Sequence, residues 1–319
     1  MESIRRAITQ RRNELKGFAI LWVVFFHMRL GNIGFLYQVQ RIGYGGVDIF
    51  FFLSGFGLYT SLSHQPQLGG YLKRRAKRLL PAYLPFCLLW LAVMIPLQKM
   101  GLGKALKTIV GNGLMLGYFF DGPLMINWYV SALAASILLA PLLVWLLRRL
   151  PKVWPLWLAL CFAAGLLTLG TGRMMALSRL PVFFLGMVFA SPVLDKVKRS
   201  TLLILSAVGL VLGLAALELC LNRYPDTLTA YGTYWYPFVL IAPALCIGLS
   251  RLMDRLPGMG ILQVLGGASF EIFLWNAWQE WLFKYQWQIT SRLWWVLFGL
   301  LDIALGLGCH ALIKKMKKH

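Results

Sequence analysis

The sequence predicts an all-α fold, a polytopic integral membrane protein of about ten transmembrane helices with both termini in the cytoplasm. Of its 319 residues, 59% are hydrophobic and only 13% are charged, whereas soluble domains have about 45–50% apolar and about 25% charged residues. Apolar runs occupy almost the whole length, and short basic loops separate them. We therefore expect one membrane domain over residues 1–319, with no separate soluble domain.

The apolar runs, bounded by charged or turn-forming residues, predict ten helices centred near Val23, Leu53, Leu89, Ile137, Ala164, Leu185, Val208, Leu240, Ile272 and Ala304. The sixth is short, and we expect it to begin inside the membrane. Ten spans place both termini on one side. Roughly two thirds of the 32 Lys and Arg residues fall in the termini and loops assigned to that side. The positive-inside rule makes it the cytoplasmic side, here of the cell membrane.

The formal net charge of +21 is compatible with nucleic-acid binding or with membrane topology. The basic residues cluster in short loops between apolar runs, so we expect membrane lipids and not nucleic acid as their partners. The five cysteines lie in or beside apolar runs without C-x-x-C spacing, which predicts helix packing. No combination of residues has the spacing of a metal site.

Lys16 and His27 stand eleven residues apart in the first apolar run, ELKGFAILWVVFFHM. Eleven helical steps turn about 1100°, close to three full turns, and rise about 16.5 Å. The two side chains therefore share one face of the predicted helix. If Lys16 marks the inner boundary, His27 lies near the middle of the bilayer, where an imidazole is costly and indicates a functional site.

The second run, GYGGVDIFFFLSGFGLY, contains Asp48 near its outer end. Its glycines predict close approach of helix backbones at positions 43, 45, 46, 55 and 57. Asp48 is either a helix cap or structural ion pair, or a carboxylate that orients His27 or an acceptor hydroxyl. Glu271 falls in the middle of the run GGASFEIFLWNAW, and we expect it, with Asn276, to face the same interior as His27.

Five further ionisable side chains lie within or next to apolar runs: Asp121, Glu218, Glu280, Asp302 and His310. Ionisable groups inside a membrane usually pair with one another. For these five, pairing at helix ends is favoured over a role in chemistry.

The most cationic segment is YLKRRAKRLLPAY. Arg75 and Arg78 are i,i+3 neighbours, and Arg74 and Arg78 are i,i+4 neighbours, so their guanidinium groups gather where a helix meets the cytoplasm. Guanidinium groups suit bidentate binding of phosphate. Taken alone, the cluster is more typical of a topogenic patch against anionic lipid headgroups.

Two outer loops, residues 222–237 and 279–295, are rich in Trp, Tyr, Asn, Gln and Thr. This composition favours an aromatic belt at the membrane interface. It also suits a surface on which sugar rings stack and bond to amides. Both interpretations can hold at once.

Three segments together resemble the acyltransferase 3 family, integral-membrane acyltransferases that modify cell-surface sugars and some small molecules. They are LKGFAILWVVFFH, GGVDIFFFLSGF and RRAKRLLPAY, and weaker similarities follow in family order in NWYVSALAASILLAP, RLPVFFLGM and LGGASFEIFLW. The resemblance implies transfer of an acyl group from cytoplasmic acyl-CoA to an acceptor outside. Acetyl-CoA, or another acyl-CoA, is then a co-substrate, with no permanently bound cofactor.

The family's basic-x10-His arrangement falls on Lys16 and His27, with lysine where many members have arginine. Its Arg-x-x-Arg falls on Arg75 and Arg78. The resemblance implies that His27 is a general base or carries the acyl group itself. The resulting candidates are, for the CoA phosphates and thioester, Lys16, Arg74, Arg75 and Arg78 and, for catalysis, His27, Asp48 and Glu271.

The family's Trp-x-x-Ser element falls on Trp128 and Ser131, but the carboxylate that many members carry soon afterwards is missing, since residues 132–135 read Ala-Leu-Ala-Ala. Asn276 stands where many members end the late motif with histidine. With Arg179, these are the acceptor-site candidates. The leading hypothesis is O-acetyl transfer to an exported glycan or another acceptor in the cell envelope.

Two other classes of protein stay open at this stage. A proton-coupled transporter or exporter of a small molecule or lipid-linked sugar would suit ten helices with buried His, Asp and Glu, although no inverted repeat supports it. A membrane scaffold or polymerase partner would be indifferent to substitution of His27. The sequence also leaves open the acyl group, the acceptor and assembly into a homo-oligomer.

Overall fold

The computed structural model describes residues 1–32, 34–65, 67–121, 127–171, 173–229, 232–256 and 259–317. As predicted, these residues form an all-helical fold, with no strand among them. Short 3-10 and π turns join several of the helices. The α-helices are α1 (Glu2–Gln10), α2 (Arg12–His27), α3 (Phe35–Arg41), α4 (Gly46–His64), α5 (Leu68–Leu97), α6 (Leu102–Gly113), α7 (Gly117–Asp121), α8 (Asn127–Arg149), α9 (Trp154–Leu166), α10 (Met174–Leu177), α11 (Leu180–Ala190), α12 (Arg199–Glu218), α13 (Phe238–Arg255), α14 (Gly260–Gly267), α15 (Ser269–Trp281) and α16 (Arg292–Met316).

The chain is a multi-pass membrane protein. Within the described residues, six helical segments are long and apolar enough to cross a bilayer: Gly43–His64, Leu68–Leu97, Trp128–Arg149, Arg199–Arg223, Thr233–Arg255 and Arg292–Met316. Each of the ten predicted centres lies in a helix. However, α2 and α15 have only 16 and 13 residues, fewer than the roughly 20 that span a bilayer. The count of ten and the cytoplasmic position of the termini remain predictions.

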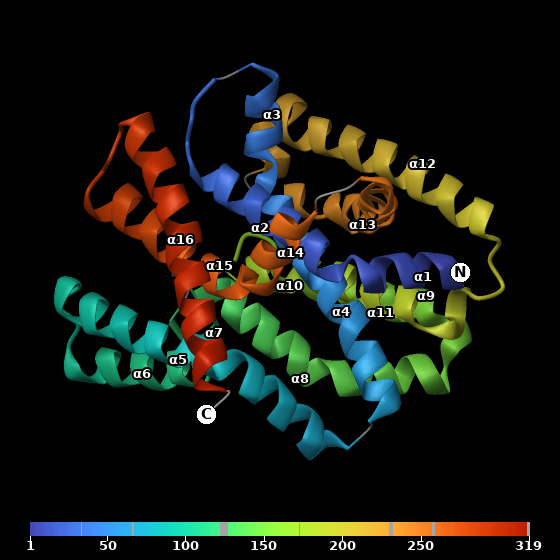
Figure 1. Ribbon diagram of the computed structural model, residues 1–319, viewed down its shortest axis with the longest axis horizontal. Coiled ribbons are helices and arrows are strands. Elements are labelled where there is room, and N and C mark those ends of the chain that lie inside the picture. Colours follow the sequence, from blue (N-terminus) through green and yellow to red (C-terminus); the bar gives the residue numbers. More distant parts are fainter. Residues whose placement is uncertain are drawn as a thin grey trace.

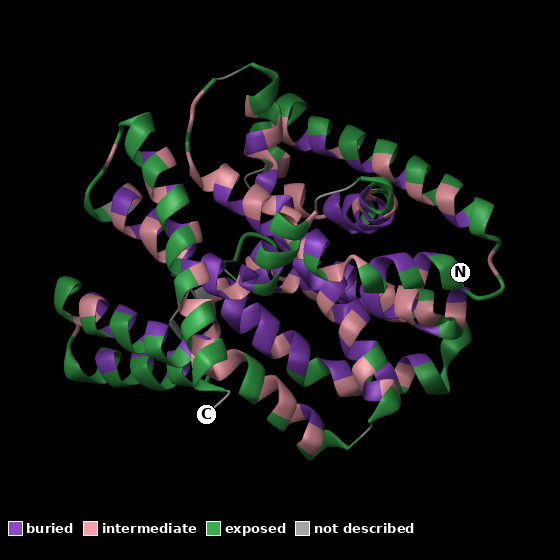
Figure 2. Cartoon of the chain, in the orientation of Figure 1, coloured by how far each residue is buried: buried purple, intermediate pink, exposed green. Residues whose placement is uncertain are grey.

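The helices differ in how much of their surface is buried (Figures 1 and 2). In α4 most residues are buried, whereas α12 and α16 lie at the outside and are mostly exposed. The exposed side chains of these outer helices are largely apolar, for example Ile204 and Val211 in α12 and Leu293 and Leu300 in α16. A water-soluble bundle would carry polar groups there, so these faces suit contact with lipid.

Glycines bring α4 and α11 into backbone contact, as the sequence predicts for α4. A Cβ atom added at Gly55 would collide with the carbonyl oxygen of Phe183, and one added at Gly186 would collide with that of Phe52. The absence of a side chain at each glycine therefore lets the backbone of the other helix approach closely. Gly17 of α2 and Gly266 of α14 form a second reciprocal pair, so α2 packs closely enough to lie in the centre of the bundle.

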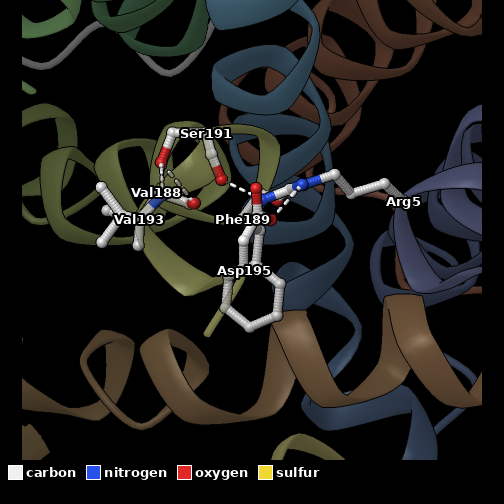
Figure 3. A network of polar contacts seen from close by, with 6 residues as sticks. All are labelled: Arg5, Val188, Phe189, Ser191, Val193 and Asp195. Atoms are coloured by element: carbon white, nitrogen blue, oxygen red, sulfur yellow. Dashed lines mark hydrogen bonds and ion pairs between the residues drawn. The ribbon is translucent and has the colours of Figure 1, made fainter. Parts of the chain in front are cut away.

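Arg5 ties α1 to the last turn of α11 (Figure 3). Its Nε donates to the carbonyl oxygen of Phe189 at 2.8 Å, and its Nη2 donates to that of Ser191. Its Nη1 also forms an ion pair with Asp195 at 2.6 Å. The last carbonyls of a helix have no partner within the helix and carry partial negative charge, so a guanidinium satisfies them well.

We expect Arg5→Met to lower the thermal unfolding midpoint of the protein in detergent micelles. The substitution leaves two carbonyls and a carboxylate without their donor, a loss of about 1–3 kcal/mol after allowance for partial exposure. The matched control is Arg6→Met, because Arg6 is exposed on the same helix. Equal midpoints for the two variants would show that the Arg5 contacts contribute nothing to stability.

Candidate active site

One face of α2 lines two separate cavities. Arg12 and Lys16 line the smaller, which we call the cationic cavity, and Val23 and His27 line the larger, which we call the histidine cavity. These four positions are four, seven and four residues apart, and such spacing keeps them on one face, as predicted for Lys16 and His27. The cationic cavity is further lined by Phe50, Ser54, Leu58, Arg75, Arg78, Leu79, Tyr129, Leu133, Ile137, Ser269 and Phe270.

The histidine cavity is the larger of the two, with a volume of about 690 Å³. This size suits a small-molecule or sugar ligand. Besides Val23 and His27, it is lined by Phe26, Arg29, Gly31, Tyr37, Gln40, Arg41, Tyr44, Val47, Trp128, Met175, Arg179, Leu221, Tyr234, Trp235, Phe273, Ala277, Glu280 and Lys284.

His27 is the last residue of α2, and the backbone after it turns sharply. Arg29 has a φ of +46° and Gly31 a φ of +71°. The left-handed region is costly for arginine and open to glycine, and it cannot continue a right-handed helix. The turn sends Arg29 back toward α15, where its Nη2 lies 3.8 Å from the Glu280 carboxylate.

The imidazole of His27 contacts α15 through both ring nitrogens. Nδ1 lies 2.5 Å from Oδ1 of Asn276, and Nε2 lies 3.3 Å from a carboxylate oxygen of Glu280. Asn276 and Glu280 are i,i+4 neighbours, so their side chains project from the same face of the helix. This face of α15 packs against the end of α2, where Asn276 contacts one ring nitrogen of His27 and Glu280 contacts the other.

Glu271, which we expected to face the same interior as His27, instead pairs with a histidine of α16. Glu271 contacts Nδ1 of His310 on α16 at 3.0 Å. Nine residues of helix separate Glu271 from Glu280, a rise of about 13.5 Å and a turn of two and a half revolutions. The two carboxylates therefore lie on opposite faces of α15, and Glu280 is the one that reaches His27.

Two residues that we assigned to helix-end pairing belong to the surroundings of His27. Glu280 contacts the imidazole directly. Asp302 of α16 accepts a hydrogen bond from Nδ2 of Asn276 at 2.9 Å. The side chain of Asp121 lies outside the described part of the chain, and Glu218 accepts a hydrogen bond from Asn222 at 2.5 Å.

Asp48 forms an ion pair with Arg179, and both side chains are almost fully buried. Nε of Arg179 lies 3.5 Å from the Asp48 carboxylate, and its Nη1 donates to Ser178 Oγ at 2.8 Å. The guanidinium also packs over the rings of Trp128 and Trp235, at 5.2 and 4.7 Å from their centroids. The structure thus favours the ion-pair alternative for Asp48 over contact with His27.

The acceptor-site candidates separate into two groups. Trp128 and Arg179 line the histidine cavity, and Asn276 binds the imidazole at its edge. Ser131 is fully buried, and its Oγ accepts a hydrogen bond from the backbone N–H of Tyr118 at 3.2 Å. Ser131 therefore joins α7 to α8 and does not line this cavity.

The cationic cavity collects cations from two helices. Arg12 and Lys16 come from α2, and Arg75 and Arg78 come from α5. Arg12 donates to the carbonyl oxygen of Leu53 at 3.1 Å. Among the described residues, no Asp or Glu lines this cavity, so the four positive charges lack a carboxylate there. Such an arrangement fits a phosphate-bearing ligand.

Small side chains make room for this cluster. A Cβ atom at Gly57 would collide with the guanidinium of Arg12. Arg75 donates to Ser61 Oγ at 3.0 Å, which fixes its position against α4. Arg74, predicted as a third phosphate ligand, does not line the cavity.

Two aromatic rings that contact each other belong to the linings of the two cavities. Tyr129 lines the cationic cavity and Phe273 lines the histidine cavity. Their ring centroids are 4.2 Å apart. A ligand that reached from one cavity to the other would have to pass beside these two rings.

Sequence reasoning missed Arg12, Glu280 and Asp302 as site residues. Arg12 is four residues before Lys16, and Glu280 is four residues after Asn276, so a search for i,i+4 partners of the chosen residues would have found both. Nothing in the local sequence of Asp302 connects it to α15, because that contact depends on how the helices pack.

The acyltransferase 3 family model, described as an acyltransferase domain, matches residues 13–309. No curated protein and no solved structure matches the chain significantly. The matched segment includes His27 and all of its described polar contacts. Arg12 lies just before it.

Proposed function

Because the chain belongs to the acyltransferase 3 family, we propose that it is a membrane O-acyltransferase of the cell membrane. Acyl-CoA, with acetyl-CoA as the expected donor, binds on the cytoplasmic side. A hydroxyl of a glycan or other cell-envelope acceptor takes the acyl group on the opposite side. The observation that carries this proposal is the imidazole of His27, which contacts α15 at both ring nitrogens and lines the histidine cavity.

In the proposed reaction, His27 is the general base. Nε2 takes the proton of the acceptor hydroxyl as its oxygen attacks the thioester carbonyl. The ring becomes an imidazolium, and the Glu280 carboxylate stabilises that charge from 3.3 Å. The C–S bond then breaks, and the imidazolium returns the proton to the departing thiolate of CoA.

The cationic cavity supports the donor half of the reaction. CoA carries several phosphate charges, and Arg12, Lys16, Arg75 and Arg78 offer four cations without a competing carboxylate. Along α2 the step from Lys16 to His27 is about 16.5 Å. The extended arm of CoA would cover this distance, passing Tyr129 and Phe273.

The histidine cavity supports the acceptor half. Trp128, Trp235 and Tyr234 line it and offer faces on which sugar rings stack. Arg29 and Arg179 add donors for hydroxyl or acidic groups. Membrane lipids surround the exposed apolar faces of the outer helices.

We expect acylation of cell-surface glycans to depend on His27 and Glu280 but not on Glu271. In cells that lack the native gene, His27→Ala should lower acyl content by about 10²–10⁴-fold, the usual contribution of a general base. Glu280→Gln should lower it at least tenfold, because the imidazolium loses its counterion. Glu271→Gln is the matched control, with the same change on the opposite face of α15.

The measurement is mass spectrometry of surface glycans from cells with equal amounts of each variant in the membrane. The expected signal is the mass of one acyl group per acceptor residue. Full acylation with His27→Ala would remove His27 from the mechanism. If Glu271→Gln lowered acylation as much as Glu280→Gln does, the role assigned to Glu280 would be wrong.

We expect the double variant Arg75→Gln, Arg78→Gln to bind acetyl-CoA at least about 10²-fold more weakly, because two charge-assisted contacts to phosphate are lost. The matched control is Lys73→Gln with Lys77→Gln, which removes the same charge from exposed positions of α5. Isothermal titration of the purified proteins in detergent measures both affinities. Equal weakening in the two variants would point to a general charge effect and against docking in the cationic cavity.

A further inference from the structure

Asp302 is a buried carboxylate that the proposed reaction does not use. It lies in α16, only 2% of its surface is exposed, and it does not line the histidine cavity. Amide groups surround it. Nδ2 of Asn276 donates to it at 2.9 Å. The amide of Gln279, oriented with its nitrogen toward the acceptors, donates to the same carboxylate and to the carbonyl oxygen of Phe298 at 3.0 Å.

This arrangement fixes the orientation of the Asn276 amide. Two amide nitrogens donate to Asp302, as they would to an ionised carboxylate that only accepts hydrogen bonds, so the nitrogen of the Asn276 amide faces Asp302. The oxygen of the amide then faces His27, where it lies 2.5 Å from Nδ1. Because an amide oxygen also only accepts, Nδ1 must carry a proton.

The proton on Nδ1 determines where the neutral ring can act as a base. A neutral imidazole has one N–H and one lone pair. With Nδ1 protonated, the lone pair of the neutral ring lies on Nε2 at the histidine cavity. The Glu280 carboxylate, 3.3 Å from Nε2, also only accepts hydrogen bonds, so its attraction to Nε2 begins when the ring takes up a second proton. The opposite tautomer would place a proton on Nε2, and the ring could not take one from a hydroxyl.

We propose that Asp302 is a positioning residue that acts through Asn276 to hold His27 in its Nδ1–H tautomer. The consequence for transfer rests on the proposed function of His27, but the tautomer itself can be measured without any reaction. A simpler role for Asp302 would be to tie α16 to α15. The two roles give different results in the Asp302→Asn variant.

The two variants are Asp302→Asn and the exchanged pair Asn276→Asp with Asp302→Asn. In Asp302→Asn, the amide introduced at position 302 can donate to the oxygen of Asn276. The Asn276 amide then turns over, its nitrogen faces Nδ1, and the proton of the ring moves to Nε2. In the exchanged pair, the carboxylate introduced at position 276 accepts the Nδ1 proton directly, and the amide at position 302 donates to it.

The decisive measurement is ¹⁵N NMR of the full protein labelled at histidine, in micelles, at a pH where the rings are neutral. The chain has four histidines, and the signals missing from His27→Gln assign His27. We expect a protonated Nδ1 in the wild type, a protonated Nε2 in Asp302→Asn, and a protonated Nδ1 again in the exchanged pair. A protonated Nε2 of His27 in the wild type overturns the proposal and requires neither of the two Asp302 variants.

Transfer rates give the second readout. We expect Asp302→Asn to lower the rate by about 10²–10⁴-fold, as for a base in the wrong tautomer, and the exchanged pair to recover at least tenfold. A merely structural tie predicts no loss of rate in Asp302→Asn, because the bond between α15 and α16 persists in that variant, and an unchanged rate there would overturn the proposal. If His27→Ala keeps full activity while the NMR pattern holds, the proposed function fails and the assignment of Asp302 stands.

Discussion

A bundle with an apolar outer surface can hold charged side chains in its interior only if they pair with one another or face a ligand. The described part of the chain obeys this constraint around the histidine cavity. His27 contacts Asn276 and Glu280, and Asp48 contacts Arg179. These contacts join helices that are far apart in sequence, so the groups that place His27 also help to hold α2 against α15.

The same constraint explains why the other end of α2 is different. Arg12, Lys16, Arg75 and Arg78 meet in one cavity that no described carboxylate lines. Four cations in a small space repel one another, and an anionic ligand would relieve the repulsion. We interpret the two cavities as the donor and acceptor ends of one site, with Tyr129 and Phe273 between them.

Much of this arrangement could be predicted from residue spacing, because the spacing acts within one helix. The shared face of Lys16 and His27 and the close approach at Gly55 are of this kind. The partners of His27 are not. Glu271 lies in the middle of its apolar run and Glu280 near the end. Position in the run therefore pointed to Glu271 as the partner of His27, whereas Glu280 is the carboxylate that contacts it. Only the rotation of α15 against α2 decides between them, and that rotation is a property of the packed bundle.

In the mechanism that we propose, the acyl group travels along α2 from one side of the membrane to the other. The direct test uses sealed proteoliposomes containing purified protein in one orientation, with labelled acetyl-CoA supplied on only one side and a glycan acceptor on only the other. We expect labelled acceptor when acetyl-CoA is on the side of the N-terminus, and none when the two compartments are exchanged. Transfer only when donor and acceptor share the same side would contradict it.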